Sequence, residues 1–211
     1  MPYLLTLFLS VFVLSGCSST YYSAMETVGY HKRDIMVDRV EEAKESQQEA
    51  QQEFSSALEA LEALTRFDGG DLEKMYENIN GKYEDSEQAA EDVSKRINAI
   101  EDVSDALFAE WQEELELYKN AKLRRDSEKK LRQTKTSYTA MLSAMKRAEK
   151  KMTPVLDALR DNTLYLKHNL NANAIGSLQG EFVDLERDIE VAIKEMKGAI
   201  SESDKFLANL K

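Results

Sequence analysis

The sequence VEEAKESQQEAQQEFSSALEALEAL, residues 40–64, decides the fold class. Apolar residues recur in it at alternating steps of three and four positions, and Gln47 fills one of these slots. Such spacing lines up the apolar side chains along one side of an α-helix and favours coiled-coil-like packing. Most of the other residues are Glu, Gln and Ala, which have high helix propensity. The stretch predicts a long helix with an apolar stripe formed by Val40, Ala43, Ala50, Phe54, Ala57, Leu61 and Leu64.

The same pattern recurs three more times along the chain. Asp68–Gly70 reads DGG, a glycine stop for the first helix, and Asp71 can cap the next one. The second stripe runs to Trp111 and Tyr118, and the register slips by one residue at 121–126. The third stripe spans 131–166, HNLNANAIG interrupts the pattern at 168–176, and the last stripe spans 178–210. We therefore expect four similar helical segments.

Similar helix lengths and short connections favour antiparallel neighbours. The predicted fold class is all-α: an elongated antiparallel helical bundle with coiled-coil-like packing and three to four long helices. The range arises because the turn expected near 120–126 contains no Gly or Pro, so the second and third segments could also form one rod. Pro154 should kink the third segment, since proline removes a helix hydrogen bond. Residues 31–211 are expected to form this single bundle domain.

The N-terminus carries an apolar run that ends at the chain's one cysteine, in LSGC, residues 14–17. The run is too short to span a bilayer but suits a secretory signal. LSGC resembles a bacterial lipobox, and this resemblance implies cleavage between Gly16 and Cys17 and lipidation of Cys17. The alternative is an ordinary N-terminal helix with a buried cysteine.

The lipobox resemblance divides the N-terminus into a lipoprotein signal peptide, residues 1–16, and a lipidated cysteine with a tether, residues 17–30. Several acyl chains such as palmitate would anchor the protein firmly to a membrane. Ser18 after the cysteine implies the periplasmic face of the outer membrane, within the bacterial cell envelope. With Cys17 modified, no disulfide can form, so the helices must be held together by their core.

Charge is distributed unevenly along the predicted helices. Residues 38–116 hold 24 acidic and 7 basic residues, whereas residues 119–151 hold 12 basic and 3 acidic ones. One interpretation is that the basic helix pairs with the acidic helices and fixes their alignment. The other is that the basic turn faces the membrane, because each basic residue near an anionic surface contributes about 1 kcal/mol. The candidates for head-group contact are Arg124, Arg125, Lys129 and Lys130.

Residues 161–181 are unusually rich in asparagine. Asn tolerates turn conformations and bonds to nearby backbone, so a well-capped turn between helices explains the cluster. The functional alternative is a partner-binding tip at the far end of the rod, formed by His168, Asn169, Asn171 and Asn173.

No chemical motif emerges from the sequence. NGKY, residues 80–83, lacks the upstream glycine and the following Ser or Thr of a phosphate loop. His31 and His168 lack the spacing of paired metal ligands, so we expect neither a metal site nor a cofactor. The net charge of −11 and the expected export make nucleic acid a poor partner.

The segment MTPVLDALRDNTLYLKHNLNANAI, residues 152–175, is the most distinctive part of the chain. Together with the lipobox and the long acidic helical half, it resembles the bacterial family called domain of unknown function 2959. The resemblance implies a helical envelope protein, often of the lipoprotein type, and brings no known reaction or catalytic residue.

Three functions follow as hypotheses. The first is a non-enzymatic, lipid-anchored scaffold, spacer or accessory subunit that contacts an unknown envelope protein partner, with the oligomeric state open. The second is a ligand- or lipid-binding bundle, which requires a roomy apolar cavity near Met141, Met145 and Met152. The third and weakest is an envelope hydrolase, which requires a cleft with converging titratable groups.

Overall fold

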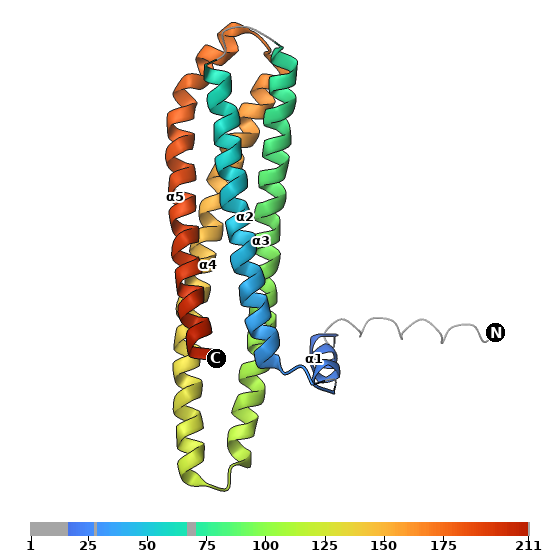
Figure 1. The fold of residues 1–211 in the computed structure, drawn as a ribbon, viewed down its shortest axis with the longest axis vertical. Coiled ribbons are helices and arrows are strands. Elements are labelled where there is room, and N and C mark those ends of the chain that lie inside the picture. The colour runs from blue at the N-terminus through green and yellow to red at the C-terminus, as the bar shows by residue number, and fades with distance from the viewer. Residues whose placement is uncertain (1–16, 28, 67–70, 211) are drawn as a thin grey trace, which may run out of the picture.

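The computed structural model describes residues 17–27, 29–66 and 71–210, and these residues are almost entirely helical (Figure 1). A short helix, α1 (Cys17–Thr27), precedes four long ones. These are α2 (Lys32–Thr65), α3 (Leu72–Glu114), α4 (Ala121–His168) and α5 (Ala172–Leu210), and a 3-10 turn, η1 (Leu115–Leu117), follows α3. Within the described ranges there is no strand. The all-α prediction is confirmed, and the chain forms four long helices rather than three.

The four long helices run up, down, up and down along one axis (Figure 1). α2 packs against α3 and α5, and α4 packs against the same two helices, so the order around the bundle is α2, α3, α4, α5. With 48 residues, α4 is about 72 Å long at a rise of 1.5 Å per residue. The helix continues through Pro154 without ending. The molecule is an elongated rod.

The apolar stripes predicted from the sequence form the core. Every predicted stripe position of α2 is buried, Gln47 included. Elsewhere along the stripes, serines occupy slots between apolar residues and bond back to their own helix. The Ser86 hydroxyl donates to the Lys82 carbonyl at 2.7 Å, and the Ser203 hydroxyl donates to the Ala199 carbonyl at 2.8 Å. Small polar residues are thus accommodated in the core because their hydroxyls find partners within the same helix.

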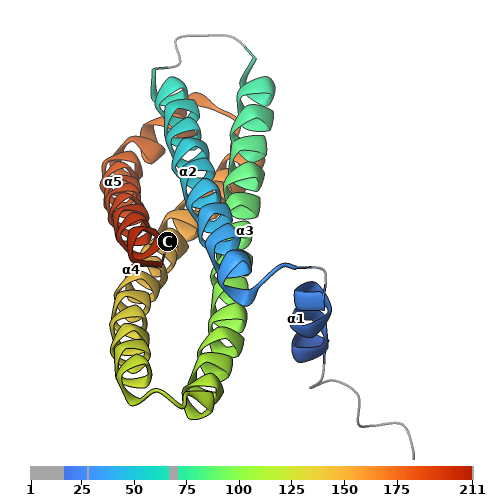
Figure 2. The same cartoon turned by 60° about the horizontal axis from the view of Figure 1, so that its bottom comes forward.

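The α3–α4 hairpin extends beyond the ends of its neighbours (Figures 1 and 2). The start of α2 is held at the level of Glu110, whose carboxylate accepts from Lys32 at 3.0 Å. The end of α5 is held at Lys130, whose ammonium donates to the Asn209 carbonyl at 3.0 Å. Since α4 begins at Ala121, roughly 14 Å of it lies beyond the last turn of α5.

A second apolar cluster holds the two arms of this hairpin together. Phe108 and Leu115 from the α3 side pack with Leu131 of α4. Trp111 packs against this cluster, and its indole N–H donates to the Ser127 hydroxyl at 2.9 Å. Trp111 is half-buried and packs on the hairpin cluster, on the side of α3 that its place on the stripe predicts.

The turn between α3 and α4 lies earlier than the sequence suggests. It is formed by η1 and residues 118–120, and residues 121–126 belong to α4, so the prediction of a turn near 120–126 is wrong in position. Asn120 provides the physical reason. Its side-chain oxygen accepts from the backbone N–H groups of Lys122 at 2.9 Å and Leu123 at 3.2 Å. An N-cap of this kind starts a helix without Gly or Pro.

The other two connections agree with the sequence prediction only in part. Asp71 caps α3 as expected, accepting from the N–H groups of Glu73 at 3.1 Å and Lys74 at 3.3 Å. The predicted glycine stop at 68–70 lies outside the described residues. The interruption expected at 168–176 is shorter, because α4 extends to His168 and α5 begins at Ala172.

The segment expected to be a tether, residues 17–30, contains helix α1. The Tyr22 hydroxyl donates to the Asp102 carboxylate at 2.8 Å, and Lys32 pairs with Glu26, so α1 is held against the lower part of α3. Gly29 follows with φ +90, a conformation that favours glycine. The proposed cleavage at Gly16 and the side chain of Cys17 lie outside the described residues.

The described core lies entirely between Tyr22 and Leu210. It consists of one continuous cluster along the bundle and the smaller hairpin cluster. A chain that begins at Ser18 keeps all of these side chains, so we expect it to fold with the same core.

Candidate functional site

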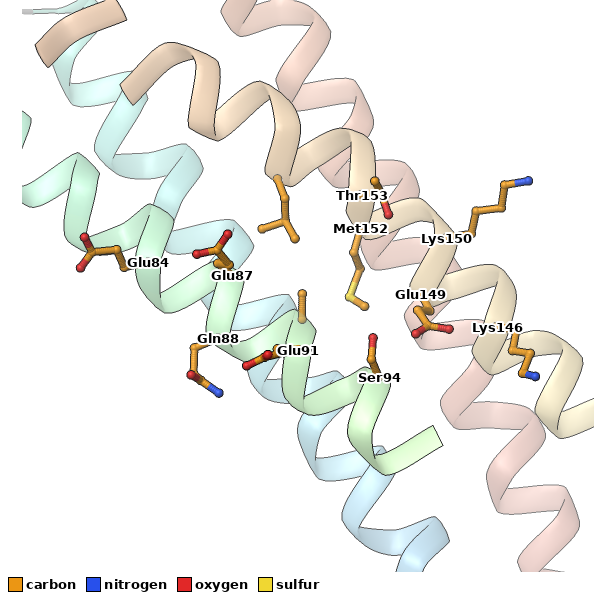
Figure 3. Close-up of a pocket in the computed structure, with 12 residues that line it drawn as sticks. Glu84, Glu87, Gln88, Glu91, Ser94, Lys146, Glu149, Lys150, Met152 and Thr153 are labelled. Atoms are coloured by element: carbon orange, nitrogen blue, oxygen red, sulfur yellow. The ribbon is translucent and has the colours of Figure 1, made fainter. Parts of the chain in front are cut away.

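A groove of about 800 Å³ runs along the outside of the bundle between α3 and α4. Its apolar floor is formed by Ala90, Met152 and Leu156. Figure 3 shows Met152 and Glu149 pointing from α4 toward α3, and Ser94 pointing from α3 toward α4. Lys150 extends away from the space between the helices (Figure 3). The groove is therefore an open depression with a narrow apolar base.

Two polar groups that line this groove bond to side chains outside the lining. Lys146 pairs with Glu101 at 2.6 Å, and the Tyr83 hydroxyl donates to Glu87 at 2.8 Å. Burial and the bond to Glu87 raise the pKa of Tyr83. A phenol with a raised pKa is a weaker acid, so Tyr83 is not activated as a nucleophile.

The four residues predicted to contact head groups lie together in the first three turns of α4, at the end of the hairpin. All four side chains are exposed. Arg124 pairs with Glu116 at 2.6 Å, and Lys130 donates to the Asn209 carbonyl. Arg125 and Lys129 have no hydrogen bond or ion pair among the described residues. The structure thus gathers these residues on one exposed tip.

The same tip carries apolar side chains that sequence reasoning missed. Leu117 is 77% exposed, Leu123 is 52% exposed and Tyr118 is 41% exposed. The stripe pattern predicts Tyr118 in the core, and that prediction is wrong because the chain leaves α3 before it. Leu123 falls in the stretch where the stripe slips register, which is the signal that could have marked it as exposed. We call residues 116–130 the hairpin tip.

At the opposite end of the rod, the residues of the predicted partner-binding tip lie around the α4–α5 turn. His168 and Asn171 are exposed. Asn169 ends α4: its amide group donates to the Tyr165 carbonyl at 2.9 Å, which supports the capped-turn interpretation for this residue. The side chain of Asn173 lies outside the described part. Asn162 is buried and bonds to the Ala158 carbonyl at 2.8 Å, so it is not part of the tip.

Three exposed apolar residues that the sequence did not single out lie beside this turn. They are Leu164, Tyr165 and Leu170, exposed by 50%, 40% and 39%. We call them, together with His168, the far-end patch. Both ends of the rod therefore present apolar side chains to solvent, but only the hairpin tip combines them with a dense basic cluster.

Within the described ranges, no group of three or more His, Cys, Asp or Glu side chains is placed to hold a metal ion. Among the same residues, no helix combines the length and the apolar character needed to cross a bilayer. A small, partly open pocket lined by Leu61, Leu64 and Phe182 has a volume of about 10 Å³. That is room for about one water molecule.

Comparison with known proteins gives a family. A search of curated proteins found no match. The sequence profile of a family described as "Protein of unknown function (DUF2959)" matches residues 21–210, which spans α2 to α5 and the second half of α1. Because the match covers most of the chain, including both ends of the rod, the protein belongs to the DUF2959 family.

Proposed function

We propose that the protein is a non-enzymatic, lipid-anchored helical spacer or scaffold of the bacterial envelope. Cys17 carries the lipid, and the rod holds a partner protein away from the membrane through its far-end patch. The single observation behind this proposal is the shape and filling of the bundle: a rod about 70 Å long with a continuous packed core. A filled rod resists bending because close-packed interiors transmit strain.

The rival function, binding of a ligand or lipid inside the bundle, needs internal space. Met141 and Met145 are 0% exposed and Met152 is 2% exposed, and all three belong to the continuous core cluster. The partly open pocket beside Phe182, at about 10 Å³, is far below the 300 Å³ or so of small-molecule sites. The α3–α4 groove offers this rival function a different site, one for an elongated ligand on the surface of the bundle and not inside it.

The proposal of a non-enzymatic role rests on the arrangement of titratable groups. A hydrolase of the envelope needs a nucleophile, a base and an orienting group within hydrogen-bond reach. In the α3–α4 groove, the carboxylates of α3 face water or bond to neighbouring side chains. Glu87 accepts from Tyr83, as described above.

The anchor and the partner contact can be tested separately. Cells that produce the wild-type chain or a Cys17→Ala variant are fed labelled palmitate and then fractionated. We expect label in the wild-type chain only, and release of the variant from membranes by a high-salt wash that leaves the lipid-anchored wild-type chain bound. If the wild-type chain takes up no palmitate, the anchor is wrong.

The partner contact is tested by photo-crosslinking in cells. A photoreactive residue at Tyr165 or Leu170 should join the chain to one defined envelope protein. The same residue at Val183, which is 63% exposed on α5, is the matched control and should give no such product. Equal crosslinking at all three positions would contradict a far-end partner site.

A further inference from the structure

We propose that the hairpin tip is a second membrane contact, which inserts Leu117, Tyr118 and Leu123 into the interface of an anionic phospholipid surface. This inference rests on the proposed function, because it assumes that the anchored end of the rod faces a membrane. It adds to the proposed function a defined surface that contacts the membrane. With that contact, the rod would stand at a fixed angle to the membrane.

The hairpin tip combines exposed apolar and basic side chains at the extremity of the molecule. Leu117 is the most exposed large apolar residue of the described part, at 77%. It lies next to Tyr118 in a region where residues 116–130 contain six basic and three acidic residues. Segments that lie on membranes combine these features, because apolar side chains enter the acyl boundary while Lys and Arg meet anionic head groups. Tyrosine also favours this interface.

The hairpin also projects beyond the neighbouring helices. Roughly 14 Å of α4 lies beyond the end of α5, so neither α2 nor α5 can block the approach of the tip to a flat surface. The hairpin is also stiffened by its own core. The Lys135 ammonium lies over the Phe108 ring, 5.5 Å from its centroid, and makes a cation–π contact with it. An apolar tip on a stiffened projection is suited to entering an interface without unfolding.

The position of α1 brings the proposed anchor near the hairpin end of the rod. It lies in the half of the rod that ends in the hairpin (Figures 1 and 2), where Tyr22 bonds to Asp102. Leu117 lies about 22 Å beyond Asp102 along α3 and η1, at roughly 1.5 Å per residue. An anchor at Cys17 and an inserted tip would meet the membrane at two separated points. Two such points hold a rod at a fixed inclination, whereas one lipid would leave it free to swing.

A protein partner is the less favoured occupant of this tip. Interfaces between proteins are depleted in lysine at their centres and have complementary shape. The hairpin tip is convex and contains Lys119, Lys122, Lys129 and Lys130 around its apolar residues. The far-end patch lacks this basic cluster, so the two ends of the rod are suited to different surfaces.

The test uses the chain that begins at Ser18, which lacks Cys17 and keeps the described core. Leu123→Cys gives this chain a single thiol for an environment-sensitive fluorophore. The labelled protein is mixed with vesicles of phosphatidylglycerol and phosphatidylcholine, or of phosphatidylcholine alone. We expect a blue shift and quenching by lipids that carry spin labels in the acyl chain, with the anionic vesicles only. A label at Val183 on α5 should remain in water.

Matched variants separate the apolar from the basic contribution. Leu117→Gln with Leu123→Gln should weaken binding to anionic vesicles about tenfold, whereas Val183→Gln with Val191→Gln should leave it unchanged. Arg125→Glu with Lys129→Glu should weaken binding at least tenfold, since each basic residue contributes about 1 kcal/mol near such a surface. The control pair Lys150→Glu with Lys151→Glu changes the net charge equally, but in the middle of α4.

The outcomes decide between the alternatives. If the label at 123 stays in water with anionic vesicles, or if tip and control variants bind alike, the second membrane contact is wrong. Capture of a protein at the hairpin tip, without vesicle binding, would also overturn it. None of these results bears on palmitate uptake by Cys17, so failure of this inference is distinguishable from failure of the anchor.

Discussion

Replacing Gln47 by methionine tests the account of the core most directly. Gln47 is 0% exposed and occupies a stripe position of α2 between Ala43 and Ala50. Neither its side-chain nitrogen nor its side-chain oxygen has a hydrogen-bond partner in the protein. The buried serines differ from it, because their hydroxyls are short enough to reach a carbonyl of their own helix. At Gln47 the stripe places an unpaired polar side chain in the core, which lowers the stability of the fold.

The magnitude follows from these facts. A buried polar group without a partner costs about 1–3 kcal/mol. Methionine has nearly the same side-chain length as glutamine, and volume-conserving changes in a core usually cost less than about 1.5 kcal/mol. We expect Gln47→Met to stabilise the fold by about 2 kcal/mol. For a chain of this size, that corresponds to a rise in Tm of about 4–8 °C.

The assay is thermal and urea unfolding followed by circular dichroism, with the chain that begins at Ser18. Gln48→Met is the matched control, because Gln48 is exposed on the same helix and should change stability by less than about 0.5 kcal/mol. Light scattering on both variants shows whether the rod keeps its oligomeric state, since a polar residue in a stripe can also fix helix register. A Gln47→Met protein that is no more stable than the wild type would refute the reasoning.

Three further predictions concern the core, a cap and pH. Met145→Ala should destabilise the fold by about 2–5 kcal/mol in urea unfolding, because Met145 is 0% exposed in the continuous cluster and a cavity would remain. A loss of stability below about 1 kcal/mol would argue against a filled core. Asn120→Ala should lower the stability of the fold by about 1 kcal/mol and increase amide hydrogen exchange in the first turn of α4, since it removes the side-chain cap. Unchanged exchange would mean that the cap does not determine where the helix starts. Burial raises the pKa of Tyr138, so the unfolded chain loses this proton first, and stability should fall as pH rises above about 10. Tyr138→Phe should reduce that fall between pH 9 and pH 11 while Ser104 keeps its bond to the Glu101 carbonyl at 2.8 Å, and an equally steep fall would show that other groups cause it.

Several features were determined by the sequence alone, because they depend on residues close together in the chain. The alternation of three and four sets which side of each helix is apolar, so the buried stripe of α2 follows from the spacing of its residues. Asp71 is recognisable as a cap because its partners lie two and three residues away. Asn120 caps α4 through local contacts of the same kind. The apolar stripe slips register just after Asn120, however, and the turn was predicted at that slip. The residues of the slip belong to the first turns of α4 instead.

The tertiary structure alone decided which stripe positions are covered. Tyr118 continues the apolar stripe of α3, yet it is exposed because α3 ends before it and because α2 and α5 do not reach the hairpin tip. The local pattern cannot contain this information, since it depends on where other helices begin and end. Whether a side chain is buried depends on neighbours that are distant in sequence. At the two tips of the rod those neighbouring helices end, so apolar side chains there remain exposed.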